Sequence, residues 1–348
     1  MSSFFPATNQ ARLVPGVGSP LAKIAIIGEF TDNYDYNNLR PFSGPAGGVL
    51  DQCLHAAGLI RGEVYLTNCI KSKPTQRPRA KGSGGTNFEY YDDRSNKFTA
   101  TGLVHVEYLR EELDALSANI LVPCGNAAMA AVTQGNWRSN KLRGYIMESR
   151  GLARPRKVLP TASPAASLRG GYTSRHLIVV DFKKAKIECE FPEVMRPVRE
   201  LVYSYNTVQE ALDWLAYYET QEEVATDIEV INFSISCISF SSDPSIACVI
   251  PIADRWTEDE ELQIWRGVQR VLGNIDSRKV LQNGIFDIQF MLAQHGVVVR
   301  GELADTMIAH SVMFPELKKS LAFLGSIYCG AQEYWKDAVK FDNIKEES

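Results

Sequence analysis

One stretch near the N-terminus constrains the fold of this chain more than any other. Residues 24–27 form a short apolar run, rich in isoleucine, that ends at Gly28, as expected of a strand buried on both faces. Apolar residues then recur at helical spacing over 49–57, and a second apolar run over 64–66 leads into Thr67 and Asn68. This order of strand, polar loop, helix and strand predicts a βαβ unit, and therefore a parallel sheet covered by helices.

Three side chains are predicted to gather at one edge of this sheet. In βαβ units, ligands bind beyond the carboxyl ends of the strands, which is where Glu29 and Asn68 fall. Phe42 lies in the loop between them. Each residue alone has a plain structural explanation, with Glu29 capping a loop, Phe42 in the core and Asn68 in a turn. Together, two polar groups and an aromatic ring predict a ligand pocket.

Length and composition indicate an intracellular protein of two domains. A chain of 348 residues exceeds the usual size of one domain, and 45% hydrophobic with 22% charged residues is an ordinary globular composition. No apolar run reaches the roughly 18 residues of a membrane span, and the N-terminal residues lack a signal-peptide pattern. Seven cysteines without a Cys-x-x-Cys pair favour buried thiols over disulfides or zinc. We therefore expect a cytoplasmic protein without membrane contact.

Charge is divided unequally between the two halves. Residues 1–190 carry 24 Lys and Arg against 16 Asp and Glu, a balance of +8, whereas residues 191–348 carry 13 against 25, a balance of −12. The basic excess clusters over 71–81 and over 150–157. Such clusters are typical of phosphate contacts, although the Gly- and Ser-rich segment 71–98 also fits a solvated loop. Because the first cluster directly follows Asn68, we predict that it binds DNA through Lys71, Lys73, Arg77, Arg79 and Lys81.

Alternating strands and helices continue through the first half, which we expect to form a domain over residues 1–190. Its further elements are predicted as helices at 106–116, 127–132 and 176–189 and strands at 120–122 and 157–160. Prolines mark a linker over 191–199, followed by a second domain over 200–348. Its strands are predicted at 202–205, 225–229, 234–240 and 246–250, with antiparallel pairing because the connections are short. Its helices are predicted at 208–218, 258–271, 285–294, 306–314 and 320–328.

The second half contains carboxylates in a pattern that suits a metal ion. Asp227 and Glu229 are alternate residues of a predicted strand and so project from the same face. Two carboxylates that close repel each other unless a cation lies between them, and Asp287 at the start of a helix adds a third oxygen ligand. This set suits Mg²⁺ or Mn²⁺ in phosphodiester cleavage. Since Asp-x-Glu pairs arise often by chance, the prediction depends on their place at the end of an apolar strand.

The first half resembles the uracil-DNA glycosylase superfamily, and most closely its family 4. The resemblance is carried by Gly28-Glu29, Arg40-Pro41-Phe42-Ser43-Gly44 and Thr67-Asn68, and by motifs at 14–18, 141–144 and 158–169. It implies a three-layer α/β fold with a pocket for a flipped base. There Phe42 would stack on the base, Asn68 would pair with it, and Asp35 or Glu29 would position water. From the later motifs it implies Ser163 in the pocket and Arg143 and Arg169 on DNA.

The second half resembles the ribonuclease H-like 3′-5′ exonuclease domain of family A DNA polymerases, which has a mixed sheet. Asp227 and Glu229 match its first motif and Asp287 its second, while 304–307 and 319–321 are similar to the segments that follow. The resemblance implies single-stranded 3′ ends of DNA as substrate and a polymerase domain or chain as partner. A glycosylase-like domain before such an exonuclease is similar to the arrangement in certain bacteriophage DNA polymerases, which implies a bacterial host cytoplasm.

The sequence departs from both families at informative positions. Ser163 stands where family 4 has a histidine that stabilises the negative charge developing on uracil, and a neutral hydroxyl is a poorer donor for that role. Leu39 replaces a glycine before Arg-Pro-Phe. The four cluster-binding cysteines have no counterparts, and Ser72 occupies one of their positions, so we expect no iron–sulfur cluster. The third exonuclease motif, Tyr-x-x-x-Asp, is missing after Tyr328, which predicts an incomplete metal site.

These features together predict a DNA-binding α/β protein whose two domains, one glycosylase-like and one an exonuclease, act with a polymerase in replication or proofreading. Two other interpretations stay open for the first half. In one, it is a non-catalytic module that holds DNA or a partner. In the other, it is a working base-excision enzyme for which the second half is a scaffold.

Overall fold

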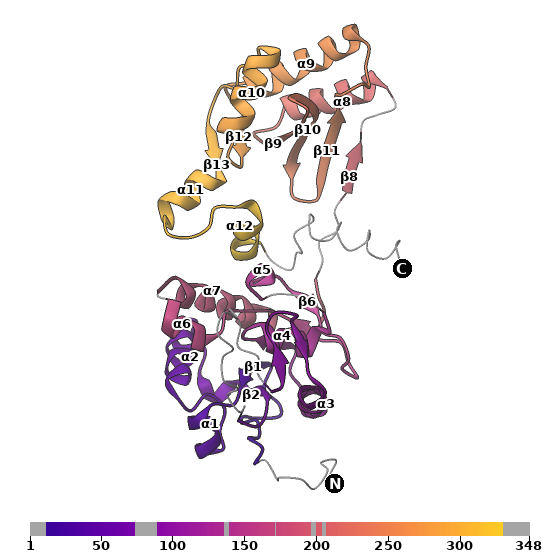
Figure 1. The fold of residues 1–348 in the computed structure, drawn as a ribbon. Coiled ribbons are helices and arrows are strands. Elements are labelled where there is room, and N and C mark those ends of the chain that lie inside the picture. Colours follow the sequence, from indigo (N-terminus) through magenta and orange to yellow (C-terminus); the bar gives the residue numbers. More distant parts are fainter. Residues whose placement is uncertain are drawn as a thin grey trace, which may run out of the picture. The chain divides into compact units, whose positions relative to one another are not determined.

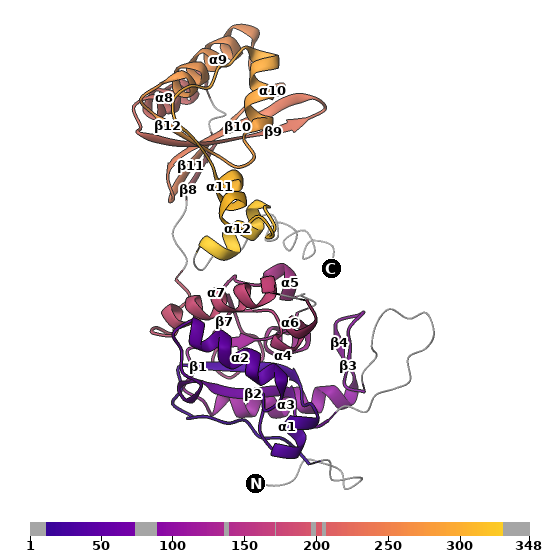
Figure 2. The same cartoon turned by 90° about the vertical axis from the view of Figure 1, so that its left-hand side faces the viewer.

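The computed structural model describes residues 12–73, 89–135, 139–170, 172–195, 200–203 and 207–329. Contacts between Cα atoms divide the chain into two units, residues 1–195 with 325–348, and residues 196–324. The division after residue 195 falls within the segment expected to be a linker. Figures 1 and 2 draw the elements of both units, which we describe separately.

The first unit is built on a five-stranded sheet with the order β2-β1-β5-β7-β6. β1 (Ile24–Phe30) pairs in parallel with β2 (Tyr65–Ile70) and with β5 (Ile120–Pro123), and β5 pairs in parallel with β7 (Lys157–Val158). The predicted parallel sheet is therefore confirmed. One strand of this sheet was not predicted: β6 (Met147–Glu148) runs antiparallel to β7 at the edge.

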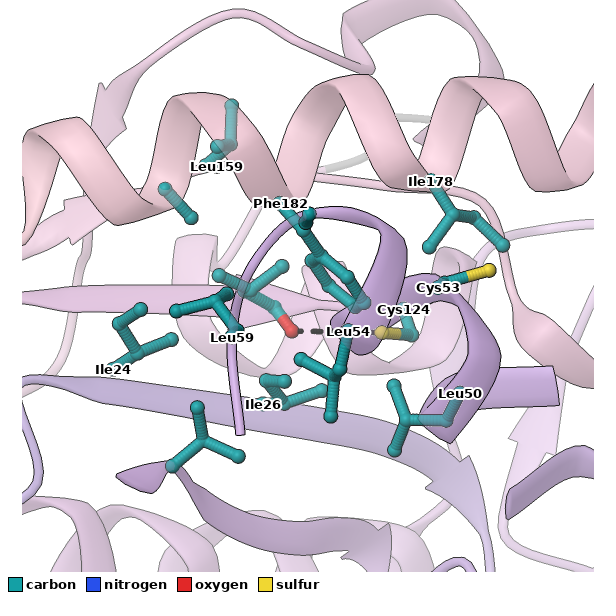
Figure 3. Close-up of a cluster of buried hydrophobic side chains, with 14 of the residues drawn as sticks. Ile24, Ile26, Leu50, Cys53, Leu54, Leu59, Cys124, Leu159, Ile178 and Phe182 are labelled. Atoms are coloured by element: carbon teal, nitrogen blue, oxygen red, sulfur yellow. Dashed lines mark hydrogen bonds between the residues drawn. The ribbon is translucent and has the colours of Figure 1, made fainter. Parts of the chain in front are cut away.

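Helices cover both faces of this sheet because β1 is apolar on both sides. Ile24 and Ile26 pack with α2 (Pro45–Ala56) and α7 (Tyr172–Glu188) on one face, in the cluster drawn in Figure 3. Ala25 and Ile27 pack with α3 (Ala100–Asp114) and α4 (Asn126–Thr133) on the other. The unit is therefore a three-layer α/β structure whose central strand is buried on both faces.

Smaller elements complete the first unit. They are α1 (Asn33–Asn38), the 3₁₀ helix η1 (Arg61–Glu63), the hairpin of β3 (Tyr91–Asp92) and β4 (Lys97–Phe98), α5 (Ser139–Leu142) and α6 (Pro164–Gly170). None of them was predicted. α1 lies within the polar loop after β1, and it begins where Asp32 Oδ1 accepts a hydrogen bond of 2.8 Å from Asp35 N.

The second unit contains a six-stranded mixed sheet with the order β13-β12-β9-β10-β11-β8. β9 (Glu223–Ile231), β10 (Ser234–Asp243) and β11 (Ile246–Pro251) form antiparallel hairpins, as predicted. β8 (Glu200–Tyr203) pairs in parallel with β11. On the other side, β12 (Arg278–Leu281) pairs in parallel with β9 and with β13 (Leu303–Asp305).

Alternation along β9 separates its core residues from its carboxylates. Val224 and Ile228 are buried in a core shared with α8 (Val208–Glu219) and α9 (Glu258–Gly273). Asp227 and Glu229 are exposed. α10 (Ile285–His295), α11 (Thr306–Met313) and α12 (Leu321–Tyr328) follow the last strands. Within the described residues, no helix combines the length and the apolar character needed to cross a membrane.

Candidate functional site

The parallel strands of the first unit end beside the residues predicted to form a base pocket. Gly28 of β1 is the register partner of Asn68 in β2. Beyond β5 and β7, Cys124 and Thr161 form a further parallel bridge. Ser163 follows two residues later, immediately before α6. The carboxyl edge of one sheet therefore carries the polar residues, as the βαβ pattern predicted.

Asp35 and Asn68 form the most sharply defined pair at this edge. Nδ2 of Asn68 donates a hydrogen bond of 2.8 Å to Oδ2 of Asp35. Oδ1 of Asp35 accepts from N of Ser43 at 2.8 Å and from its Oγ at 3.2 Å. Burial raises the pKa of Asp35, although the hydrogen bonds from Ser43 and Asn68 act in the opposite direction. Both oxygens of this buried carboxylate are thus engaged within the protein.

Phe42 lies over Gly28, beside Asn68. A Cβ on Gly28 would lie 2.3 Å from Oδ1 of Asn68 and 2.8 Å from Cζ of Phe42, so only glycine leaves room for both side chains. Nη2 of Arg61 donates a hydrogen bond of 2.9 Å to the carbonyl of Phe42. Gly47 lets α2 approach the same carbonyl, since a Cβ there would lie 1.8 Å from it. The loop that carries the aromatic ring is therefore held from two sides.

Glu29 is directed to a helix rather than to Asn68. Its Oε1 accepts a hydrogen bond of 3.1 Å from N of Ala127, in the first turn of α4. A carboxylate is favoured there by the positive end of the helix dipole. Gly125, with φ of 107°, makes room for it, because a Cβ would lie 2.3 Å from Cδ of Glu29. Glu29 therefore caps a helix, and a role for Glu29 or Asp35 in positioning water stays a prediction.

Arg143 supports the segment that leads to Ser163. Its Nη1 lies 2.6 Å from Oδ1 of Asp181, and Oγ1 of Thr161 donates to the other oxygen of Asp181 at 2.6 Å. Burial raises the pKa of Asp181, against the effect of the arginine charge. Arg143 is only 5% exposed, because the buried carboxylate requires a cation beside it. The expectation that Arg143 contacts DNA is therefore corrected, since its guanidinium binds the buried carboxylate of Asp181.

The first residue of the predicted basic cluster, Lys71, is buried and not at the surface as predicted. Lys71 is fully buried, where its Nζ binds Glu112 and Thr67, and burial lowers its pKa. It is not available for phosphate contact, which corrects the prediction. Lys73 is exposed. The remaining predicted DNA contacts, namely Arg77, Arg79, Lys81 and the side chain of Arg169, lie outside the described residues.

In the second unit, Asp287 joins the two carboxylates of β9. It lies in the first turn of α10, and its Oδ1 accepts a hydrogen bond of 3.1 Å from N of Ile228, the residue between Asp227 and Glu229. Burial raises the pKa of Asp287, the Ile228 hydrogen bond opposes this, and the charges of Asp305 and Glu229 raise the pKa further. The three predicted carboxylates therefore belong to one region.

Two further features shape this region. The register of β9 and β10 shifts between Ile235 and Cys237, and Cys237 is the partner of Glu229, so a bulge lies opposite the glutamate. Asp305 accepts hydrogen bonds from N of Gly284 at 2.7 Å and from N of Met307 at 2.8 Å, which ties the start of α10 to the start of α11. Burial acts to raise the pKa of Asp305, but its backbone donors outweigh this and lower it.

The ligands for a metal are of the right kind but do not form a complete site. Carboxylate oxygens are the ligands that Mg²⁺ and Mn²⁺ prefer. Yet within the described ranges, no group of three or more His, Cys, Asp or Glu side chains is arranged to hold an ion. Tyr334, Asp337 and Asp342, which follow the expected position of the third motif, lie outside those ranges.

Sequence analysis did not identify Phe233. This side chain is 86% exposed in the turn between β9 and β10, close along the chain to Glu229. Asn232 and Phe233 have φ of 51° and 62°, as in a tight hairpin turn, and Nε2 of Gln294 donates 2.5 Å to the carbonyl of Phe233. The sequence signal that could have identified Phe233 is a large aromatic residue at the turn between two predicted strands.

Family models match both halves of the chain. Residues 15–182 match the uracil DNA glycosylase superfamily, and residues 203–345 match a 3′-5′ exonuclease family of the DNA polymerase A type. A type-4 uracil-DNA glycosylase of Thermotoga maritima is 26% identical over 184 residues, which cover 51% of this chain and 83% of that protein. The first unit is thus similar to nearly a whole glycosylase.

One relative spans both halves. The DNA polymerase of Bacillus phage SP01 is 23% identical over 331 residues, covering 85% of this chain and 33% of the polymerase. This chain therefore corresponds to one third of that protein. Among solved structures, the catalytic core of RRP6 from Trypanosoma brucei is 19% identical with a TM-score of 0.32, covering 38% of this chain and 35% of that one.

Proposed function

We propose that the two domains of this chain have separate functions. A uracil-DNA glycosylase superfamily domain precedes a 3′-5′ exonuclease domain of the DNA polymerase A type. The first domain binds DNA and recognises a base. The second hydrolyses single-stranded 3′ ends in proofreading. The observation that carries the proposal is the hydrogen bond from Ile228 N to Asp287, which joins Asp287 to the strand of Asp227 and Glu229.

The exonuclease role is supported by the kind and placement of the charged groups. Asp227, Glu229 and Asp287 would supply part of the ligand set for Mg²⁺ or Mn²⁺, and the bound ion would supply charge stabilisation in phosphodiester hydrolysis. Burial is the main cause of the raised pKa of Asp287, and the negative charges of Asp305 and Glu229, which a cation would offset, raise it further. Phe233, exposed at the tip of the hairpin that carries Glu229, would contact a terminal base by stacking.

A partner polymerase is part of the proposal. It is supported by the alignment of this chain with one third of the phage SP01 DNA polymerase. A polymerase domain or chain would place a mispaired 3′ end before the carboxylates. It would also provide ligands that the described residues lack.

The test of the metal site is a Mn²⁺ titration of the intact chain, with the unbound ion measured by electron paramagnetic resonance. We expect weak binding that Asp227→Ala removes. The matched control is Asp213→Ala, an exposed carboxylate on α8 that should leave binding unchanged. Equal binding by the unmodified chain and Asp227→Ala would contradict the proposal.

Base recognition by the first domain is supported by a separate observation, the buried contact between Asp35 and Asn68 beside Phe42. An amide can pair with the edge of an extruded base, and an aromatic ring can stack on it. Excision is expected to be weak, because Ser163 offers a neutral hydroxyl where charge would develop. The domain would then recognise a base more effectively than it removes one.

A further inference from the structure

The amide of Asn68 is held in one orientation by its hydrogen bond to Asp35. An ionised carboxylate only accepts hydrogen bonds, so the group facing Oδ2 of Asp35 must be the NH₂ of the amide. The opposite orientation would place two oxygens 2.8 Å apart. Since Asn68 is 2% exposed, water cannot readily compensate for that loss.

Asp35 is itself fixed, so it can impose this orientation. Its Oδ1 accepts two hydrogen bonds from Ser43, through N and Oγ. Its backbone N is bound by Asp32 at the start of α1. Because the backbone N and Oδ1 of Asp35 are both held, its second oxygen, Oδ2, has one position. That oxygen faces Asn68.

The remaining groups of the amide define a pattern for a ligand. One N–H of Asn68 is used by Asp35, which leaves the second N–H and Oδ1. Oδ1 lies over Gly28, beside the ring of Phe42. In the described part of the chain, Oδ1 accepts no hydrogen bond from another side chain. Oδ1 of Asn68 can accept from N3–H of uracil while the second N–H of the amide donates to O4 of uracil. Cytosine does not fit this pattern, because its N3 is an acceptor and its amino group is a donor.

We infer that Asp35 is a positioning residue for base selection: by fixing the Asn68 amide, it makes the first domain prefer bases with an N–H beside a carbonyl over cytosine. The inference rests on the proposed base recognition and adds the residue that sets its specificity. In Asp35→Asn, the new side chain can donate or accept, so both orientations of Asn68 are satisfied. The variant should bind both kinds of base with similar affinity.

The experiment measures binding rather than excision, so Ser163 does not limit it. Single-stranded oligonucleotides would carry one uncleavable 2′-fluoro analogue of deoxyuridine or deoxycytidine, and affinity would be followed by fluorescence anisotropy. We expect the unmodified chain to prefer the uracil analogue by about tenfold or more. Asp35→Asn should reduce the preference to below about threefold. The control, Asp114→Asn, changes an exposed carboxylate at the end of α3 that accepts a hydrogen bond from N of Ala153, and it should keep the preference.

A second measurement separates failure of the inference from failure of base recognition. The side-chain amide protons of Asn68 would be followed by NMR, with slow exchange of one proton expected in the unmodified chain and fast exchange in Asp35→Asn. A uracil preference that persists in Asp35→Asn would overturn the inference. Equal binding of both analogues by the unmodified chain, with the slow proton present, would instead show that the domain does not recognise bases.

Discussion

We expect Ser163 to limit base excision by the first domain. Loss of one donor to a developing anion lowers a rate by about 10²-fold or more. We therefore predict uracil release at least about 10²-fold slower than in a histidine-bearing relative, and a gain on Ser163→His. Release from labelled DNA measures both, with Ser163→Ala as the control that should gain nothing. Robust release by the unmodified chain would refute this, and no gain in Ser163→His would show that the pocket is not catalytic.

Lys71 and Lys73 form a matched pair for mutation, because the first is buried and the second is exposed. Lys71→Met should lower the free energy of unfolding by about 3 kcal/mol, because it leaves the partly buried carboxylate of Glu112 without its cation. Lys73→Met should leave stability unchanged, since Lys73 is exposed, and should weaken DNA binding instead. Chemical denaturation and anisotropy measure the two effects. Weaker DNA binding by a folded Lys71→Met chain would restore the original prediction for Lys71.

His105 should make the stability of the first unit depend on pH. It is 4% exposed, and Nδ1 accepts from N of Lys71 at 3.4 Å. Burial, assisted by the Lys71 charge, lowers the pKa of His105 to about 4. Between pH about 6.5 and 4 the unfolded chain binds a proton that the folded chain excludes, so stability falls with falling pH, by up to about 3 kcal/mol. Denaturation midpoints of His105→Phe should change less over this range, and an identical pH dependence would contradict the assignment.

Single residues show where sequence patterns stop being informative. The βαβ pattern correctly brought Asn68 and Phe42 together, because parallel strands end at the same edge. It did not reveal that Lys71 is buried, since its partner Glu112 lies 41 residues away on another element. Arg143 and Asp181 are 38 residues apart, and the same reason applies. A cluster of Lys and Arg residues along the sequence does not indicate which of their side chains are exposed to solvent.

At the scale of the element, two adjacent glycines of α2 should behave in opposite ways. A Cβ on Gly47 would lie 1.8 Å from the carbonyl of Phe42, whereas nothing lies within 4 Å of a Cβ on Gly48. Gly48→Ala should stabilise the helix by about 0.5–1 kcal/mol. Gly47→Ala should destabilise it by about 1–3 kcal/mol, because α2 must move away from the pocket loop. Denaturant midpoints compare the two, and equal effects would contradict the packing described.

The helices and strands that sequence analysis predicted are those with an apolar face. α2 and α9 have helical periodicity because each buries one apolar face, whereas β1 is a continuous apolar run because both of its faces are buried. α1 was missed because its residues are polar, and it depends on the Asp32 cap and the contacts of Asp35. β6 was missed because it has two residues, too few to establish a period. Such elements depend on tertiary contacts that a local pattern does not contain.

For the whole molecule, the charge asymmetry predicts where DNA affinity resides. The balance is +8 over residues 1–190 and −12 over the rest. Affinity should fall steeply with salt, by roughly 0.7 in logarithmic slope for each phosphate contact on a single strand. Changing Arg77, Arg79 and Lys81 to Ser should lower affinity and reduce the slope by about 2. Equal loss on changing three exposed cations of the second unit, Arg255, Arg266 and Lys318, would show that the basic half has no special role.

We propose that the second domain removes nucleotides from 3′ ends through Asp227, Glu229 and Asp287. The most direct measurement is the shortening of a 5′-labelled single strand by the intact chain, with and without Mn²⁺. We predict slow shortening from the 3′ end that requires the ion and is lost in Asp227→Ala, but not in Asp213→Ala. Shortening that persists in Asp227→Ala or after removal of divalent ions would contradict this role of the three carboxylates.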